Sequence, residues 1–503
     1  MSRSAPNILF IMADQLTAGF LGSYGHPTVQ TPHLDGLAES GIQFDRAYCN
    51  CPICGPSRAS LSTGKLVSEI EAYDNGCDFP ASTPTFLHQL ARGGYRTLLS
   101  GKMHYVGPDQ RHGFQQRLTA DIYPSSFVWT PDWSRGAYPN PGTSVEQLSE
   151  AGKCEWSMQL DYDEEVTFRS LEALRDLARS PADGPFFLCA SYTHPHDPFI
   201  IHEPWWSLYP DEAVSPPTIP GRPLEAHHPF NQWLQIHHRI PEFPPRENWI
   251  RAARRAYLGM VSYFDHQVGL LLRELERLGL RDQTMVVVTS DHGEMLGEQG
   301  MWFKRTFYEP SVRVPLIISG PQVSRPKRVH SAVSLVDLYP TFIGIAGLGD
   351  SEAHPSPLSG SSLQPFFAGE NPCHPGEAVI EYFSEGTCRP MRSIVRDDFK
   401  LVSVMDEDPL LFHLAEDPHE QINLFDDPEH QSVVRQLSER LFQNYQHEEH
   451  YRKVLQSQKS RRWIQEAHEN GPSPDWDIHP MASGPDRYVR RWDAQETSKR
   501  RRI

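Results

Sequence analysis

The stretch NILFIMADQ, residues 7–15, constrains the architecture of this chain more than any other. It places five consecutive large apolar residues, Ile8 to Met12, directly before Asp14 and Gln15. An apolar run of this length favours a strand buried on both faces, as in a parallel sheet covered by helices. The run is too short for the apolar region of a secretory leader, and an acidic residue follows it closely. We therefore expect a buried first strand rather than a leader.

Four further apolar runs read as buried strands, and helical patterns separate them. The runs cover residues 97–100, 186–191, 285–289 and 315–319, and the clearest helix is predicted from Trp249 to Leu278 by apolar residues at 3.6-residue spacing. This alternation predicts an α/β fold with a mostly parallel sheet flanked by helices.

Polar residues follow three of the predicted strands. They are Asp14 with Gln15, His194 with His196, and Asp291 with His292. Ligands of open parallel sheets bind beyond the carboxyl ends of the strands. We therefore expect these side chains to share one cleft.

The pattern changes near Gly376. Strands are predicted at 378–382, 392–396 and 400–404, with a helix at 432–445, which indicates a smaller α+β unit. We divide the chain into a catalytic domain over residues 1–375, a C-terminal α+β subdomain over 376–450 and an extended tail over 451–503. Two loop-rich segments, about 105–162 and 203–246, are expected to form lids or interface loops.

Composition excludes some classes of function. A length of 503 residues suits about two to three structural units. The formal net charge of −17 argues against a nucleic-acid-binding protein. No apolar run approaches the roughly 18 residues that a membrane span needs. We expect a cytoplasmic protein with mostly reduced thiols and no membrane partner.

The motif CGPSRASLSTG, residues 54–64, carries the candidate nucleophile. Pro56 disfavours helix at Gly55, which predicts a turn at Cys54 and a helix beginning near Ser57. An anion held there would meet helix N-terminal N–H groups and the guanidinium of Arg58. The alternative is a structural turn in which nearby cysteines bind metal or form a disulfide. No other Cys/His group has zinc-like spacing.

These segments resemble the type I sulfatases of the alkaline phosphatase superfamily, whose signature is C-x-P-S-R-x-x-L-x-T-G. The resemblance covers nearly the whole chain and is strongest to the choline sulfatases, through residues 7–16, 99–104, 106–110, 192–198, 290–298 and 457–463. It implies an alkaline-phosphatase-like fold. It also implies that a formylglycine-generating maturation enzyme oxidises Cys54 to formylglycine (3-oxoalanine), whose hydrated aldehyde attacks sulfur.

The resemblance implies a role for each candidate residue. The implied ligands of a divalent metal, calcium in the family, are Asp14, Gln15, Cys54, Asp291 and His292. An imidazole ligand leaves manganese open. The implied catalytic roles are stabilisation of the nucleophile by Arg58, contact with sulfate oxygens by Lys102 and Lys304, breakdown of the covalent hemiacetal by His104, and protonation of the leaving group by His196.

The resemblance also implies a substrate. Asn75 matches a residue that donates to the transferred group. Trp129, Glu385 and Asp493 match residues that hold a quaternary ammonium group, for which aromatic faces and carboxylates are suited. Choline sulfatases also place a histidine where this chain reads YPNPG at residues 138–142. We expect a sulfate-monoester hydrolase with choline-O-sulfate as the favoured substrate.

Three alternatives stay open. An aryl or other alkyl sulfate could be the substrate. A phosphonate or phosphate diester hydrolase would share the formylglycine, the Asp-Gln pair and the Asp-His pair. That family has a Tyr-x-Thr motif where this chain has Lys102 and His104. A non-catalytic sulfate-ester binder would keep Cys54 unmodified. The long tail implies a homodimer or homotetramer in which one subunit's tail reaches a neighbouring site.

Overall fold

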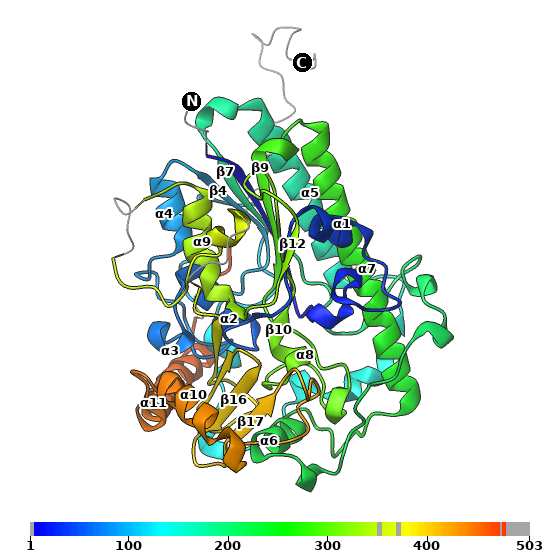
Figure 1. The fold of residues 1–503 in the computed structure, drawn as a ribbon, viewed down its shortest axis with the longest axis vertical. Helices are drawn as coiled ribbons and strands as arrows, with labels where there is room; N and C mark the ends of the chain where they lie inside the picture. Colours follow the sequence, from blue (N-terminus) through cyan, green and yellow to red (C-terminus); the bar gives the residue numbers. More distant parts are fainter. Residues whose placement is uncertain (1–4, 350–354, 369–373, 473–474, 479–503) are drawn as a thin grey trace.

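The computed structural model describes residues 5–349, 355–368, 374–472 and 475–478. In this part of the chain the first strand, β1 (Asn7–Ala13), lies within an eight-stranded sheet of order β12-β2-β11-β9-β1-β7-β4-β5 (Figure 1). The other strands are β2 (Ile42–Phe44), β4 (Arg96–Gly101), β5 (Gln116–Arg117), β7 (Phe186–Ser191), β9 (Thr284–Ser290), β11 (Leu316–Ser319) and β12 (Lys327–Val329). All five predicted strands are confirmed.

The sheet is mostly parallel, as predicted. Strands β5, β4, β7, β1 and β9 run parallel to one another. Strand β11 is antiparallel to both β9 and β2. The apolar run of β11 did not reveal its direction, because a buried strand looks the same in either orientation.

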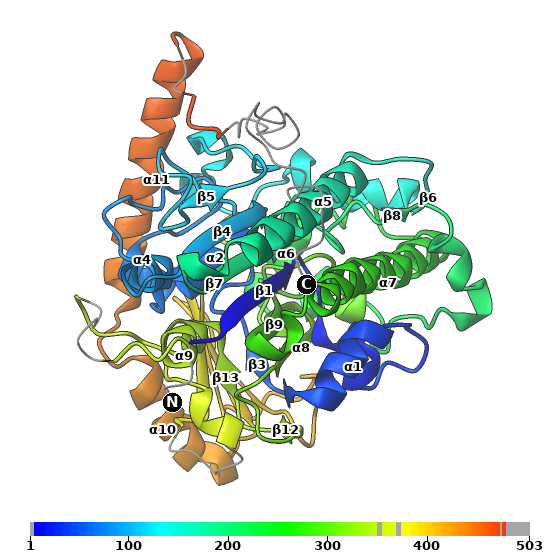
Figure 2. The same cartoon turned by 90° about the horizontal axis from the view of Figure 1, so that it is seen from above.

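Two hydrophobic cores cover the two faces of the sheet. Successive side chains of a strand point to opposite faces, so Ile8, Phe10 and Met12 join one core and Leu9 and Ile11 join the other. Helices α2 (Cys54–Thr63), α4 (Phe86–Arg92) and α9 (Leu338–Ile345) lie on the first face; α1 (Pro32–Ser40), α5 (Met158–Arg179) and α7 (Glu247–Arg277) lie on the second (Figure 2). Helix α7 confirms the longest predicted helix.

The segment after Gly376 forms a second sheet, an antiparallel one. Its strands are β14 (Glu377–Tyr382), β15 (Met391–Arg396), β16 (Phe399–Val404) and β17 (Leu410–His413), and helix α10 (Gln431–Leu441) covers it. The three predicted strands are confirmed, whereas β17 was not predicted and the helix ends before Tyr445. Helix α11 (His447–Glu469) follows and runs through position 451, so the tail boundary proposed there falls inside a helix.

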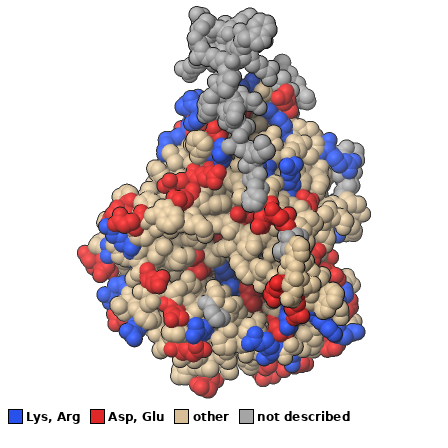
Figure 3. Space-filling model, turned by 180° about the vertical axis from the view of Figure 1, so that it is seen from behind, with Lys and Arg blue, Asp and Glu red and all other residues tan. Residues whose placement is uncertain are grey.

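The remaining elements are short. They are β3 (Ala47–Tyr48), β6 (Gly152–Lys153), β8 (Ile200–Ile201), β10 (Arg313–Val314), β13 (Val333–Ser334), α3 (Val67–Ile70), α6 (Pro229–His237) and α8 (Glu309–Val312), with several 3₁₀ turns. None of the helices in the described ranges is both long and apolar enough for a membrane span. Acidic and basic side chains are intermixed on the face seen in Figure 3.

Candidate active site

Helix α2 begins at Cys54 itself, which corrects the prediction of a turn there and a helix start near Ser57. Ile53 is the extended residue that precedes the helix. Pro56 therefore falls in the first helical turn, where its missing N–H would have had no intrahelical partner. The turn expected from Pro56 is displaced to the residues before Cys54. The thiol thus lies at a helix N-terminus.

Four buried donor groups converge beside this helix start. One ligand atom each of Asp14, Cys54, Asp291 and His292 lies within 4.8 Å of the others. The Cys54 Sγ atom is 3.2 Å from His292 Nε2 and 3.7 Å from Asp14 Oδ1. His292 Nδ1 is 3.1 Å from the carbonyl oxygen of Gly293, so a proton on Nδ1 leaves the Nε2 lone pair facing the cluster. These carboxylates and the imidazole fit a divalent cation.

Buried cations surround the same carboxylates. Arg58 Nε donates to Asp291 Oδ2 at 2.8 Å and its Nη2 donates to Asp14 Oδ2 at 3.3 Å. Its Nη1 donates to the Lys102 carbonyl oxygen at 2.6 Å and to Ser191 Oγ at 2.8 Å. The Lys102 ammonium contacts Asp14 as well. Every guanidinium nitrogen of Arg58 is therefore used to fix the cluster.

The environment of Cys54 differs from that of the neighbouring cysteines. Burial alone would raise its pKa, but the charges of Lys102 and Lys304, together with His292 and His104, hold the pKa of Cys54 well below its ordinary value. Burial raises the pKa values of the thiols of Cys49 and Cys51. All three cysteines are unpaired, so the disulfide alternative for this turn is not realised.

Lys304 and His196 form the second part of the site. Lys304 contacts the Gln15 side-chain oxygen, and its Nζ lies 2.6 Å from His196 Nε2. His196 Nδ1 is 2.7 Å from the Asp197 carbonyl oxygen. Burial and Lys304 oppose protonation of His196, but Asp197, Asp14 and contact with Cys54 leave its pKa raised overall. Gln15 also donates its backbone N–H to Asp291 Oδ1 at 3.1 Å.

His104 follows strand β4 in a left-handed conformation, with φ of 54°. Its ring is buried, and within the described residues neither ring nitrogen makes a hydrogen bond of ordinary geometry, although the ring lies close enough to the Cys54 thiol to contribute to its lowered pKa. The backbone N–H groups of Met103 and His104 both donate to Asp121 Oδ2 at 2.9 Å, and Arg117 pairs with the same oxygen. Sequence reasoning missed Asp121, for which the four-residue spacing from Arg117 was the available signal.

An aromatic cluster lies above Lys102. The Lys102 Nζ atom is 4.2 Å from the ring centroid of Tyr123, and the rings of Tyr123 and Trp129 are 5.1 Å apart. Trp129 also lies 5.4 Å from the ring of His104 and is 41% exposed. The structure thus brings the predicted residue Trp129 to the catalytic side chains. It adds Tyr123, which no sequence pattern indicated.

Helix α11 fixes the segment that carries Asn75. Asn75 Oδ1 accepts the Gly55 N–H at 2.9 Å, next to the nucleophile. Arg461 of α11 binds both carboxylate oxygens of the preceding residue, Asp74, at 2.7 Å and donates to Thr130 Oγ1 at 2.9 Å. This contact joins residues 387 positions apart and touches the residues adjoining Asn75 and Trp129.

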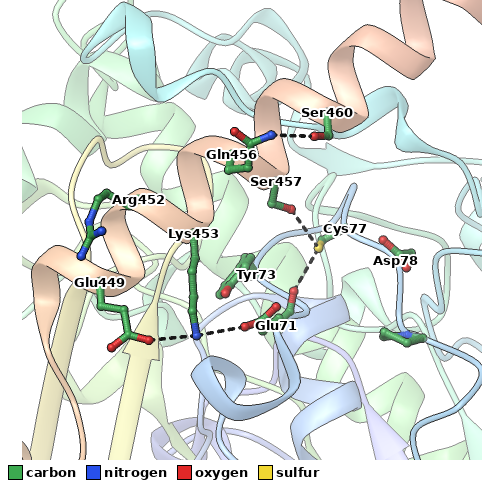
Figure 4. A pocket seen from close by; sticks show the side chains of 11 residues that line it. Glu71, Tyr73, Cys77, Asp78, Glu449, Arg452, Lys453, Gln456, Ser457 and Ser460 are labelled. Atoms are coloured by element: carbon green, nitrogen blue, oxygen red, sulfur yellow. Dashed lines mark hydrogen bonds and ion pairs between the residues drawn. The ribbon is translucent and has the colours of Figure 1, made fainter.

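A cavity of about 600 Å³ lies between α11 and residues 71–80 (Figure 4). Lys453 stands between Glu71 and Glu449, at 3.2 and 3.1 Å, and Ser457 faces Cys77. One ammonium thus balances part of the negative charge of two carboxylates that line one side of the cavity.

Of the two carboxylates predicted to contact the substrate, only Glu385 lies within the described residues. The Glu385 carboxylate is paired with Arg305 at 2.8 Å. Asp493 lies outside the described residues.

Comparisons with known proteins agree on a family. The model described as Sulfatase matches residues 6–348, that for the N-sulphoglucosamine sulphohydrolase C-terminal region matches 297–447, and that for the choline sulfatase enzyme C terminus matches 452–500. The choline-sulfatase of Rhizobium meliloti (strain 1021) is 37% identical over 518 residues, 99% of each chain. Iduronate 2-sulfatase of Mus musculus is 30% identical over 68% of this chain and 69% of its own.

Among solved structures, the phosphonate monoester hydrolase of Agrobacterium radiobacter is similar to this fold. Its TM-score is 0.69 at 25% identity, over 87% of this chain and 94% of that one.

Proposed function

The chain belongs to the sulfatase family, and we propose that it hydrolyses choline-O-sulfate or a closely related sulfate monoester through a nucleophile made from Cys54. The main support is the cluster at the start of α2, where one ligand atom each of Cys54, Asp14, Asp291 and His292 lies within 4.8 Å of the others. Sulfatases are hydrolases, so the non-catalytic binder is not proposed further.

The proposed cofactors are formylglycine, made from Cys54 by a maturation enzyme, and a divalent metal, calcium with manganese as the alternative. The donor set of Asp14, Asp291 and His292 supports this proposal, and Gln15, whose backbone N–H donates to Asp291, stays a proposed ligand. When bound, the two groups would supply a hydrated aldehyde as nucleophile and a positive charge that neutralises the ester oxygens.

The chain's own residues would then divide the remaining work. Lys102 and Lys304 would hold the sulfuryl oxygens, with Asn75 as a further contact, because negative charge on these oxygens needs fixed cations. His196 would protonate the leaving-group oxygen, which its raised pKa and its contact with the Asp197 carbonyl support. His104 would accept a proton at residue 54, which its buried ring lies close enough to influence.

The choice of choline-O-sulfate rests on two observations. The first is the 37% sequence identity to a choline-sulfatase, in an alignment that covers 99% of both chains. The second is the aromatic cluster of Tyr123, Trp129 and His104, since aromatic faces attract a quaternary ammonium group. We also propose that Glu385 and Asp493 contribute carboxylates. A cytoplasmic homodimer or homotetramer completes the proposal, and the unpaired thiols among the described residues are compatible with that location.

Phosphonate monoester hydrolysis is the second candidate, because a hydrolase of that name shares the fold. Lys102 and His104 favour the sulfatase instead, since a buried ammonium and a protonatable imidazole suit transfer of a sulfuryl group from an alcohol that is a poor leaving group.

Turnover measured in parallel on choline-O-sulfate, 4-nitrophenyl sulfate and a phenylphosphonate monoester tests the proposal. The protein is co-expressed with a formylglycine-generating enzyme, and kcat/KM is determined for each ester. We expect choline-O-sulfate to have the highest value. A higher value for the phosphonate would overturn the ranking, and a higher value for the aryl ester would reject choline as the favoured alcohol.

A further inference from the structure

We propose that Arg305 is a specificity-determining residue that acts as a built-in competitor of a cationic substrate for Glu385. The inference rests on the proposed function, because it concerns the leaving-group side of the same site. Because Glu385 is already paired with Arg305, its negative charge attracts a substrate cation less strongly than an unpaired carboxylate would.

The pairing geometry is close and one-sided. Arg305 Nε and Nη2 donate to the same carboxylate oxygen of Glu385, Oε1, at 3.1 and 2.8 Å. The Ser384 hydroxyl contacts the other oxygen, and the Tyr382 hydroxyl donates to the Glu385 carbonyl oxygen at 2.5 Å. The Arg305 and Glu385 side chains are only 5% and 11% exposed. Both oxygens of the carboxylate therefore already have donors.

The Arg305–Glu385 pair lies between the residues that precede Cys54 and the indole of Trp133. Arg305 follows Lys304 in the chain, and its backbone N–H donates to the Pro52 carbonyl oxygen at 3.1 Å, two residues before Cys54. On the other side, Trp133 Nε1 donates to the Ser384 carbonyl oxygen at 2.9 Å. Arg305 also acts on Asp197, the neighbour of His196: burial would raise the pKa of Asp197, but His196, Lys304 and Arg305 are among the groups that hold it below its ordinary value. The pair therefore lies on the leaving-group side of the site.

Electrostatics sets the consequence of the pairing. Burial would raise the pKa of Glu385, but Arg305 and the other nearby groups hold it below its ordinary value, so the carboxylate stays ionised. A substrate cation beside an ionised but paired carboxylate is attracted by Glu385 and repelled by Arg305 at similar distances. Removal of Arg305 would leave a buried, uncompensated carboxylate, which a substrate cation could then satisfy.

Several buried nitrogen atoms next to the Arg305–Glu385 pair have no hydrogen-bond partner among the described residues. They include Arg305 Nη1, His237 Nε2 and both ring nitrogens of His238. Burial, with the charge of Arg305, lowers the pKa of His237 to about 3, so this imidazole is neutral. None of these groups adds a negative charge that would attract a substrate cation.

The test is a ratio of kcat/KM values for two isosteric esters. Choline-O-sulfate carries the cation, and 3,3-dimethylbutyl sulfate replaces its nitrogen with carbon. The ratio cancels the concentration of active, matured enzyme, so incomplete folding of a variant does not affect it. The variants are Arg305→Met, Glu385→Gln and the double variant, with Arg305→Lys as a charge-retaining control. Arg305→Gln provides a second neutral substitution should Arg305→Met fold poorly.

We expect the ratio to rise about tenfold or more in Arg305→Met and to fall by a similar factor in Glu385→Gln, where Arg305 is left alone. The double variant and Arg305→Lys should return close to the original ratio. A ratio that is unchanged or lower in both neutral Arg305 variants, with both esters still hydrolysed, overturns the inference. Absence of turnover of either ester by the matured parent enzyme would instead count against the proposed function.

Discussion

Cys54 owes its proposed reactivity to its neighbours. Its thiol lies at a helix start among Lys102, Lys304 and His292, and their combined effect on its pKa outweighs that of burial. Cys49, a few residues earlier, is equally buried but has a raised pKa. The two thiols are thus chemically different although both lie in one short segment.

Asp291 provides a test of the metal site. The substitution Asp291→Asn removes one candidate ligand charge and the partner of Arg58 Nε, so we expect loss of bound metal and a fall in kcat of about 10²-fold or more. Metal content of the purified protein is measured by inductively coupled plasma mass spectrometry. Asp397→Asn, on the surface, is the matched control and should keep both metal and activity. Full metal content in Asp291→Asn would contradict the proposed ligand set.

Sequence reasoning at the residue scale succeeded where side chains follow buried strands. Asp14, Asp291 and His292 were expected in one cleft, because the carboxyl ends of parallel strands meet at one edge, and the structure places them together. Asp121 and Arg305 escaped notice. Arg305 acts through Glu385, 80 positions away, and Asp121 acts mainly through backbone N–H groups of an irregular segment, so the Arg117–Asp121 spacing alone did not indicate its role.

At the scale of elements, α11 connects the segment of Asn75 to that of Trp129, because its Arg461 binds both Asp74 and Thr130. Arg461→Met would leave Asp74 buried without its partner, at a cost of about 3–5 kcal/mol, and free the segments of Asn75 and Thr130. We expect a lower thermal unfolding temperature and a lower kcat/KM.

Arg452→Met, on the same helix and 71% exposed, is the control and should change neither quantity. A double variant with Asp74→Asn should recover part of the stability, because no charge then stays unpaired. An Arg461→Met protein with the parent's unfolding temperature and activity would show that α11 does not organise the site.

Helix α1 offers a pH-dependent test of packing. Asp265 of α7 accepts the backbone N–H groups of His33 and Leu34, and burial raises its pKa to about 7. Between about pH 4 and 7 the folded protein therefore retains a proton that the unfolded chain has lost, so this group's contribution to stability declines as pH rises.

We expect the free energy of unfolding of Asp265→Asn, minus that of the parent, to become more positive from pH 5 to pH 8, because only the parent loses this contribution. Urea denaturation at both pH values measures the difference. A difference that is constant with pH would indicate that Asp265 is ionised in the folded protein throughout.

Helix α11 also explains why some elements could not be predicted. Its residues are mostly polar, and among the few that it buries are Val454, Gln458 and Arg461, two of which are not apolar. An amphipathic stripe, the main sequence signal of a helix, is therefore weak. Helix α7 buries many apolar residues at helical spacing, and it was predicted correctly from the sequence.

At the scale of the whole molecule, the fold brings distant segments to one edge of the sheet. The α/β architecture was predictable, because each buried strand is a short apolar run. The strand order and the antiparallel β11 were not, since they depend on connections over long distances. The division at residues 375 and 450 stays a prediction, as does the assembly of the chain into an oligomer.

The central claim is that residue 54 acts as formylglycine. Peptide mass spectrometry of the protein, produced with graded amounts of maturation enzyme, measures the fraction of Cys54 that is lighter by about 18 Da. We predict that sulfatase activity rises in proportion to this fraction and is absent when Cys54 is unmodified. Full activity in protein whose residue 54 has the mass of unaltered cysteine would contradict the account.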